Sequence, residues 1–412
     1  MEEIRGPNDP HEEDLEEEEF DEENFDDDFE FDPKRFRPRT GTFKIPLIDL
    51  NKQYKDLCDE ISMNIGGLIF MGQFVGGEYL EQFEANFAGY HIKRYCAGVG
   101  SGLDALWLTL LALGIGHGDE VIVPANTFIA TALAVSHCGA TVRFVDVDPE
   151  TYNMDPELVE EALNTSTRAI IPVHLYGQSC DMTNLMKIAD DRNIYVVEDC
   201  AQAVGATWKG KRVGTFGHAG CFSFYPTKNL GGLGQGGAVI TEHKETAEKV
   251  RSYSNVGRAA GSHFEYDLKG FNSRLDTVNA MFLKRVMSRL QTWNHDRQAS
   301  AFLYDKRLED LGAVKTPHVL DDATHVYHLY ELKCINKTDR DGLREFLKEK
   351  NVETGLHYPV PIHKQPIYRF ESGNYFPVVE ELADTLLSLP MHPHLTEEEI
   401  DYIVDHIKDY FS

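Results

Sequence analysis

Short apolar runs alternate with helical patterns through the middle of this chain, and no other feature limits its fold as strongly. Strand-like runs lie at 120–124, 141–147, 168–174, 194–199, 220–225 and 237–241, and helical patterns lie at 127–138, 155–163 and 181–192. Strands that are separated by helices are typical of a mostly parallel sheet with helices on its faces. The alternation therefore predicts an α/β fold.

The two ends of the chain depart from this alternation. Residues 1–32 hold 18 acidic side chains against Arg5 alone. Such a block cannot collapse on itself, so we expect a disordered, acidic tail over 1–40, either solubilising or partner-binding. Helical character from about residue 276 to 311 indicates a bridge between a large domain over 41–290 and a small α+β domain over 291–412.

The composition argues against several classes of protein. No apolar stretch approaches the about 18 residues of a membrane helix, and no secretion signal opens the chain. The 40 basic residues are outnumbered by 68 acidic ones and form no stripe for nucleic acid. The seven cysteines are scattered, which suits reduced thiols, and no compact Cys/His spacing predicts a metal site. We therefore expect a cytoplasmic protein that binds neither membranes nor nucleic acids.

A lysine follows one apolar run, and an acid ends another. The run 220–225 is followed by Lys228, and the run 194–199 ends at Asp199, with Gln202 three residues later. Open α/β sheets bind ligands at the carboxyl ends of their strands, where desolvation can make a lysine amine nucleophilic. Asp199 could keep a pyridine nitrogen protonated while Gln202 bonds a phenolic oxygen, as pyridoxal phosphate requires. Alternatively, Lys228 is a solvated loop residue and Asp199 caps a helix.

A glycine-rich turn leads directly into a helical pattern near residue 100. Gly100, Ser101 and Gly102 precede the pattern at 105–113. Such a turn directs backbone N–H groups toward an anion, and its spacing fits neither the Rossmann nor the Walker motif. A phosphate group is therefore the expected ligand. Ser223 could add a hydroxyl to the same phosphate, or it could hydrogen-bond only to backbone.

These segments resemble, in their order, the fold-type-I, pyridoxal-phosphate-dependent sugar aminotransferases of the DegT/DnrJ/StrS family. The resemblance runs from about residue 45 to the C-terminus and rests on the blocks 100–106, 118–128, 172–178, 198–202, 223–230 and 272–276. Many relatives have Thr in place of Leu103 and an acid in place of Gln235, but no catalytic group is lost. Similar sugar dehydratases have histidine in place of Lys228, so the lysine favours transamination.

The resemblance implies a role for each site residue. Lys228 would hold the cofactor covalently and act as a base, with Asp199 at the ring nitrogen and Gln202 at the phenolic oxygen. The remaining cofactor contacts would be Phe128 on the ring face, Ser101, Gly102 and Ser223 on the phosphate, and Asn272 on the phosphate from the neighbouring subunit. A homodimer with shared active sites follows from this arrangement. Phe128 could instead be a core residue.

The resemblance also implies a substrate. An amino acid, usually glutamate in this family, would give its amino group to a nucleotide-diphosphate-linked keto-deoxysugar. The segment 355–368 is similar to that of members that aminate 3-keto sugars, and there His357 and Tyr358 would contact the nucleotide sugar, although either could be a packing residue. Amination at C-4, amination of a cyclitol ketone, and a non-catalytic sensor that binds the cofactor are the alternatives.

Overall fold

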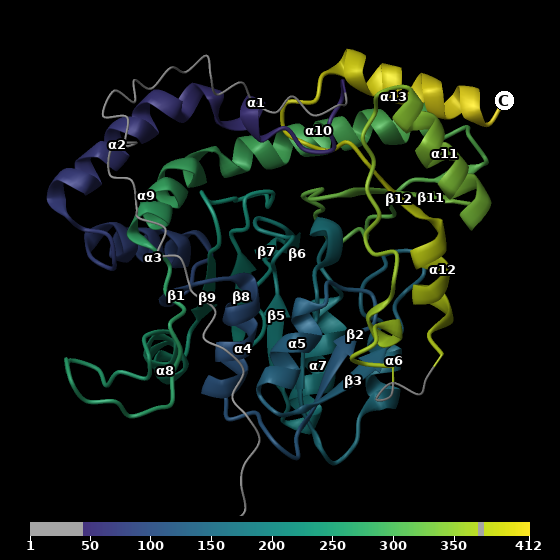
Figure 1. Cartoon of the computed structure of the whole chain (residues 1–412). Helices are drawn as coiled ribbons and strands as arrows, with labels where there is room; N and C mark the ends of the chain where they lie inside the picture. Colours follow the sequence, from purple (N-terminus) through teal and green to yellow (C-terminus); the bar gives the residue numbers. More distant parts are fainter. Residues whose placement is uncertain (1–43, 370–374) are drawn as a thin grey trace, which may run out of the picture. The chain divides into compact units, whose positions relative to one another are not determined.

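Seven strands form the central sheet of the protein in a computed structural model that describes residues 44–369 and 375–412 (Figure 1). In order across the sheet they are β1 (Tyr95–Val99), β9 (Gly237–Thr241), β8 (Ala219–Ser223), β5 (Tyr195–Asp199), β4 (Thr167–Ile170), β2 (Glu120–Pro124) and β3 (Thr141–Val145). Strands β8 to β3 pair in parallel, and β9 is antiparallel to both of its neighbours. The predicted α/β fold is confirmed. The predicted acidic tail lies outside the described residues.

Helices cover both faces of this sheet. One face carries α4 (Gly102–Ala112), α5 (Ala130–His137) and α8 (Lys244–Ser254). The other face carries α3 (Glu78–Tyr90), α6 (Pro156–Ala162) and α7 (Met182–Arg192), with α9 (Thr277–Val286) packed against α3. Because both faces are covered, most strand residues are buried and apolar, and most of the strands could therefore be predicted from the sequence.

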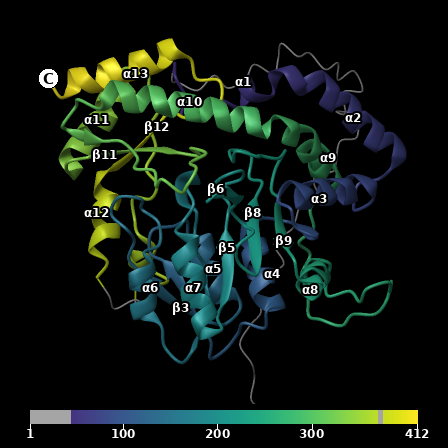
Figure 2. The same cartoon turned by 180° about the vertical axis from the view of Figure 1, so that it is seen from behind.

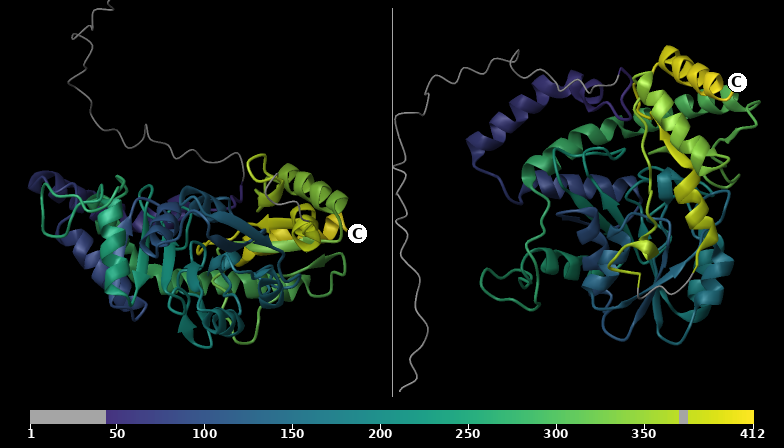
Figure 3. Two further views of the ribbon diagram at one scale, coloured as in Figure 1. Left: turned by 90° about the horizontal axis from the view of Figure 1, so that it is seen from below. Right: turned by 45° about the vertical axis from the view of Figure 1, so that its right-hand side comes forward.

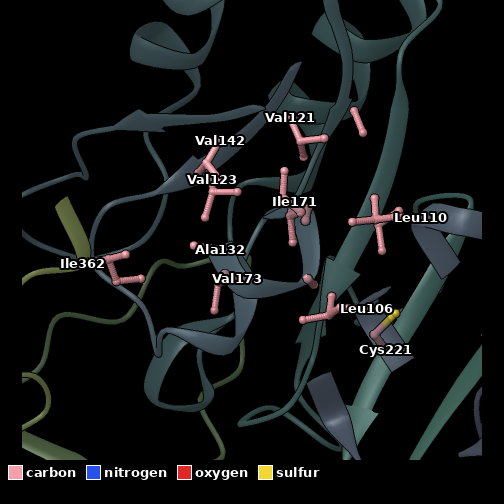
Figure 4. Packing of buried hydrophobic residues seen from close by; sticks show 14 of the residues in the cluster. Leu106, Leu110, Val121, Val123, Ala132, Val142, Ile171, Val173, Cys221 and Ile362 are labelled. Carbon is pink, nitrogen blue, oxygen red and sulfur yellow. The ribbon is translucent and has the colours of Figure 1, made fainter. Parts of the chain in front are cut away.

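Side chains of successive strand residues enter opposite layers of the core. Val121 and Val123 of β2 pack with Leu106 and Leu110 of α4, as Figure 4 shows, whereas Ile122 belongs to the cluster on the α7 side. This is the two-residue period of a pleated strand. The pairing register is fixed as a result, since a slip by one residue would exchange the two layers.

A second sheet of three antiparallel strands lies in the C-terminal part of the chain. Its strands are β10 (Val314–Lys315), β11 (Tyr330–Cys334) and β12 (Leu386–Leu389). The helices that pack with it are α10 (Leu290–Leu308), α11 (Lys337–Glu349), α12 (Pro377–Thr385) and α13 (Glu397–Tyr410), of which α10, α11 and α13 lie side by side in Figures 2 and 3. The division into domains over 41–290 and 291–412 stays a prediction.

The remaining elements are short or lie before the central sheet. They are α1 (Leu50–Tyr54), α2 (Cys58–Met71) and the two-stranded ribbon of β6 (Thr207–Trp208) and β7 (Lys211–Arg212). The end of α2 and the following residues carry exposed apolar side chains, with Phe70 93% exposed. Among the described helices, none has the length and apolar character needed to cross a bilayer.

Candidate functional site

Adjacent strands of the central sheet bring Lys228 and Asp199 together. Asp199 is the last residue of β5, and the neighbouring parallel strand β8 ends at Ser223. The chain then turns so that the Lys228 N–H donates to the carbonyl of Tyr225 at 2.8 Å. Lys228 and Asp199 are close enough for the charge of each to shift the pKa of the other. The structure therefore pairs the lysine and the acid that the sequence placed at separate strand ends.

The carboxyl group of Asp199 is buried and held by two donors. It is 5% exposed. Its Oδ2 accepts from Thr131 Oγ1 at 2.8 Å and its Oδ1 from the Ala201 N–H at 3.1 Å. Burial raises its pKa, whereas these two hydrogen bonds and the nearby charge of Lys228 act in the opposite direction. A turn, not a helix, follows β5, so the interpretation of Asp199 as a helix cap is wrong.

The amine of Lys228 is neutral in a larger fraction of molecules near pH 7 than the amine of a solvated lysine would be. Its side chain is partly buried, and burial lowers its pKa from 10.5 to about 8, with the carboxylate of Asp199 opposing the shift. A larger fraction of the amine is therefore neutral near pH 7, which is the form that attacks a carbonyl or accepts a proton. The interpretation of Lys228 as a freely solvated loop residue is excluded by this environment.

The amide of Gln202 has a fixed orientation. Its Oε1 accepts from the Tyr176 N–H at 2.6 Å, so its NH₂ group must point the other way, where one hydrogen reaches the Tyr358 hydroxyl at 3.1 Å. The second N–H has no hydrogen-bond partner among the described residues and is available to an acceptor in the site. Tyr176 also donates its hydroxyl to the carbonyl of His357, which ties together the segments that follow β4 and α11.

The N-terminus of α4 and the end of β8 form a narrow cradle. Ser101 caps α4 by accepting from the Asp104 N–H at 3.1 Å, which leaves its hydroxyl hydrogen free and leaves the N–H groups of the first turn pointing outward. A Cβ atom on Gly102 would lie 2.7 Å from the Cβ of Ser223. Glycine is therefore needed for the helix start to approach the strand end, and together these groups suit a phosphate.

The hydrogen bonding of Ser223 is compatible with both of the roles expected for it. Its side chain is 9% exposed, and its Oγ accepts from the Tyr225 N–H at 3.3 Å. Accepting this bond leaves the hydroxyl hydrogen free to donate to an anion in the cradle. The backbone bond that was considered as an alternative therefore does not compete with a phosphate contact.

Two of the predicted cofactor contacts lie at the open side of the site. Phe128 follows β2 and is 55% exposed, which excludes core packing, and its ring centroid is 5.8 Å from that of Tyr358. Asn272 is exposed and its Oδ1 accepts from Arg274 at 2.6 Å. The contact that Asn272 would make across a subunit boundary stays a prediction.

A second acid on β5, Glu198, has a structural role. Glu198 is fully buried, and its carboxylate accepts from the N–H groups of Gly214, Phe216 and Gly217 at 2.6–2.7 Å and from His174 Nε2 at 3.1 Å. His174 Nδ1 accepts from a backbone N–H, so Nε2 carries the proton. Cys200 lies within 4.8 Å of these groups, but burial keeps its thiol protonated by raising its pKa far above 9. These hydrogen bonds hold the loop 214–217 against β5.

Four polar residues of the site were missed by the sequence reasoning. Thr131 contacts Asp199 from inside a helical pattern that gives no sign of it. Tyr176 has a left-handed backbone with φ 58°, which a tyrosine rarely adopts and which follows from the Leu-Tyr-Gly turn. Glu331 and Ser388 reach His357 from β11 and β12. An acid within the apolar run of β11 was the signal that could have revealed Glu331.

Comparisons with known proteins agree with this geometry. The model of the DegT/DnrJ/EryC1/StrS aminotransferase family matches residues 57–408. A pleiotropic regulatory protein of Geobacillus stearothermophilus is 41% identical over 374 residues, which are 89% of this chain and 98% of that protein. A dTDP-3-amino-3,4,6-trideoxy-alpha-D-glucose transaminase of Streptomyces venezuelae is 40% identical over 90% of this chain and 97% of that enzyme.

A solved structure shares the whole architecture. The crystal structure of DesV from S. venezuelae in complex with a ketimine intermediate has a TM-score of 0.86 and 41% identity to this chain. The similarity covers 89% of this chain and 98% of DesV. Since the similarity extends over most of both chains, the strand ends that carry Asp199 and Lys228 belong to a shared fold and not to an isolated motif.

Proposed function

The chain belongs to the DegT/DnrJ/EryC1/StrS aminotransferase family, and from this premise we propose that it uses pyridoxal 5′-phosphate to aminate a nucleotide-diphosphate-linked 3-keto deoxysugar. Glutamate is the expected amino donor. The observation that carries the proposal is the partly buried amine of Lys228 opposite the buried carboxyl group of Asp199. An acidic group and a lysine of lowered pKa at the same edge of a sheet suit proton transfer.

The residues present fit the proposed cofactor. The cradle at the start of α4 would hold the phosphate through Ser101, the N–H groups near Gly102, and Ser223. The free N–H of Gln202 would reach the phenolic oxygen, and Asp199 would bond to the ring nitrogen. The cofactor, when bound, supplies an electron sink for negative charge on the carbon next to the transferred nitrogen.

Each residue would then contribute a separate step. Lys228 would hold the cofactor covalently until an amino acid replaces it. Its freed amine would then take a proton from the substrate carbon and deliver it to the carbon on the other side of the transferred nitrogen. Asp199, kept in place by Thr131, would keep the ring nitrogen protonated. Phe128 would cover one face of the ring and exclude water from it. When the keto sugar is aminated, the same residues would transfer the proton in the opposite direction.

The choice of substrate is supported by the segment that contains His357 and Tyr358. Tyr358 lies beside Phe128 and accepts a hydrogen bond from Gln202. His357 is close enough to Lys228 for the charge of the lysine to lower the pKa of the imidazole. These side chains would contact the sugar next to the reacting nitrogen. The S. venezuelae relative that carries a 3-amino product in its name supports amination at C-3.

The test combines colour with product analysis. The purified protein with its cofactor should be yellow, glutamate should bleach it, and a nucleotide-linked 3-keto sugar should restore the colour and yield a 3-amino sugar identified by NMR. Lys228→Ala should lose the colour change, whereas Lys209→Ala, which replaces an exposed lysine, should keep it. A product aminated at C-4 from a 4-keto sugar, but none from the 3-keto sugar, would overturn the assignment to C-3.

A regulatory role is the second candidate, because one close relative is named a pleiotropic regulatory protein. A sensor would bind the cofactor and a sugar nucleotide without turning over. The bleaching experiment separates the two functions. A yellow protein that no amino acid bleaches would favour the sensor and contradict the enzyme.

A homodimer is proposed from the exposed apolar surface near the end of α2. Ile69, Phe70, Phe74 and Val75 are 57–93% exposed, more apolar surface than single scattered residues require. A second copy of the chain would bury it, so Phe70→Glu should convert a dimer to a monomer in light scattering. A monomeric wild-type protein would contradict the proposal.

The predicted role of Asn272 in the partner's site has its own test. Lys228→Ala and Asn272→Ala subunits, each inactive alone, should regain activity when mixed, because one site of each mixed dimer is then intact. Random mixing should restore about a quarter of wild-type activity. If Asn272 acts within its own subunit, both sites of the mixed dimer are damaged and no activity returns.

A further inference from the structure

Three polar side chains form a hydrogen-bonded line from the second sheet into the site. Glu331 of β11 lies opposite Ser388 of β12, and Ser388 pairs on its other edge with Gly355. This ladder brings His357 beside Ser388. Ser388 Oγ lies 2.5 Å from Glu331 Oε1 and 2.7 Å from His357 Nδ1.

The burial of the three groups increases away from the site. The side chain of His357 is 27% exposed, and Ser388 and Glu331 are at most 1% exposed. Glu331 Oε2 has no hydrogen-bond partner among the described residues. The line therefore connects a fully buried carboxyl group to an imidazole that is close enough to Lys228 for the charge of the lysine to lower the imidazole pKa.

The number of hydrogens on this line fixes the tautomer of His357. A serine hydroxyl has one hydrogen. If Glu331 is ionised, Ser388 donates to it, so His357 donates from Nδ1 and its Nε2 is an acceptor. If Glu331 is protonated on Oε1, it donates to Ser388, Ser388 donates to His357 Nδ1, and the ring proton lies on Nε2.

Protonation on Oε1 is the favoured form of the neutral acid. A proton on Oε2 would be a buried donor without an acceptor, whereas a buried carbonyl-type oxygen without a donor costs less. Burial and the nearby cation of Lys228 lower the pKa of His357 to about 4, so the ring is neutral at physiological pH. Its tautomer, and not its charge, is then what can vary.

We propose that Glu331 and Ser388 are positioning residues that set the tautomer of His357, so that Nε2 offers a hydrogen to the nucleotide-sugar substrate while Glu331 is protonated. Only the identity of the ligand at Nε2 rests on the proposed function. A sugar carbonyl or a phosphate oxygen can only accept, so it would bind the Nε2–H tautomer and be rejected by the other form. Among the described residues, no side chain or backbone group is bonded to Nε2.

The tautomer of His357 should change between neutral and alkaline pH, where Glu331 ionises. Burial raises the pKa of Glu331 to about 8, with the Ser388 hydrogen bond opposing the shift. Besides His357, the titratable groups around Glu331 are Tyr152, Tyr176, Tyr358, Glu150, His318 and His325. Burial raises the pKa of the three tyrosines beyond this range and lowers that of His325 to about 3. Lys228, with a pKa of about 8, must be separated by experiment.

Nitrogen-15 NMR of histidine-labelled holoenzyme tests the proposal directly. The His357 signal is assigned by its loss in His357→Gln, and its two nitrogen shifts report the tautomer. Wild type should hold the proton on Nε2 at pH 6.5 and on Nδ1 at pH 9.5, with a midpoint near the pKa of Glu331, about 8. A tautomer that stays the same over this range in wild type would overturn the proposal without any variant.

Three variants assign the transition to the line of side chains. Ser388→Ala should abolish the pH-dependent exchange, because it removes the connecting hydroxyl. Lys228→Ala should keep it, which excludes the lysine as its source, and His318→Gln should keep it as a matched histidine control. Persistence of the exchange in Ser388→Ala, or its loss in Lys228→Ala, would contradict the assignment.

Kinetics separates this proposal from the proposed function. In wild type, kcat/KM for the keto sugar should fall about tenfold per pH unit above the midpoint. This limb should be absent in Ser388→Ala, whereas a merely structural loss would lower the rate equally at every pH. If the tautomer of His357 changes with pH but no sugar is aminated, the proposed function is refuted and the proposal for Glu331 and Ser388 is supported. If the sugar is aminated but the tautomer of His357 does not change with pH, only the proposal for Glu331 and Ser388 is refuted.

Discussion

The stability of Glu331→Gln relative to wild type should increase as the pH rises. Glu331 is 1% exposed and its only hydrogen-bond partner among the described residues is Ser388. Burial raises its pKa from 4.5 to about 8. Glutamine has almost the same shape but never ionises, so its own contribution to stability does not change with pH.

The sign and size follow from proton binding. Below pH 4.5 the folded and unfolded chains both hold the proton, and between pH 4.5 and 8 only the folded chain does. The free energy of unfolding of wild type should therefore fall by about 1.4 kcal/mol per pH unit in this window. The advantage of Glu331→Gln over wild type should thus rise by about 4 kcal/mol between pH 5 and 8. Above pH 8 it should level off.

Urea unfolding followed by circular dichroism at pH 5, 6, 7 and 8 measures this difference. Subtracting wild type from variant at each pH cancels the titration of all other groups. Glu349→Gln, which replaces an exposed glutamate of α11, should show no such slope. A stability difference for Glu331→Gln that does not change with pH would refute the raised pKa and the burial argument behind it.

Three further changes probe the site and the tail. Gly102→Ala, whose Cβ would lie 2.7 Å from Ser223, should weaken pyridoxal phosphate binding at least about tenfold in a fluorescence titration, whereas Gly66→Ala, which meets open space, should not; equal affinities would contradict the cradle. Thr131→Val removes a donor from Asp199, so it should raise the pKa of Asp199 further and lower kcat about tenfold, and a wild-type rate would show that the bond is dispensable. Deletion of residues 1–38 should leave turnover unchanged in a steady-state assay, and a large loss would show that the acidic tail takes part in catalysis.

The central strands could be predicted because burial on both faces makes their sequences apolar. The runs at 120–124 and 237–241 coincide with β2 and β9. Strand β1 was missed because it is short and contains Gly98, close to the glycine-rich turn before α4. The run at 168–174 extended beyond β4, which ends at Ile170, because the residues that follow are buried without belonging to the strand.

Candidate site residues could be predicted where they stand beside a local pattern, such as a strand end or a glycine-rich turn. Asp199 and Lys228 follow apolar runs, and the order of parallel strands then brings them together. Glu331 and Ser388 meet His357 through the register of an antiparallel ladder, and pairs of that kind depend on how distant segments align. No local pattern in the sequence specifies such an alignment.

The two neighbouring acids on β5 have separate tasks. The carboxylate oxygens of Glu198 accept hydrogen bonds from loop 214–217 and from His174, and these bonds anchor the strand end that carries Asp199. None of these anchoring groups comes from 355–368, so substitutions in that segment leave the anchor of the strand end intact. A scaffold of this kind allows descendants to acquire new sugar preferences while the amino-transfer step stays the same.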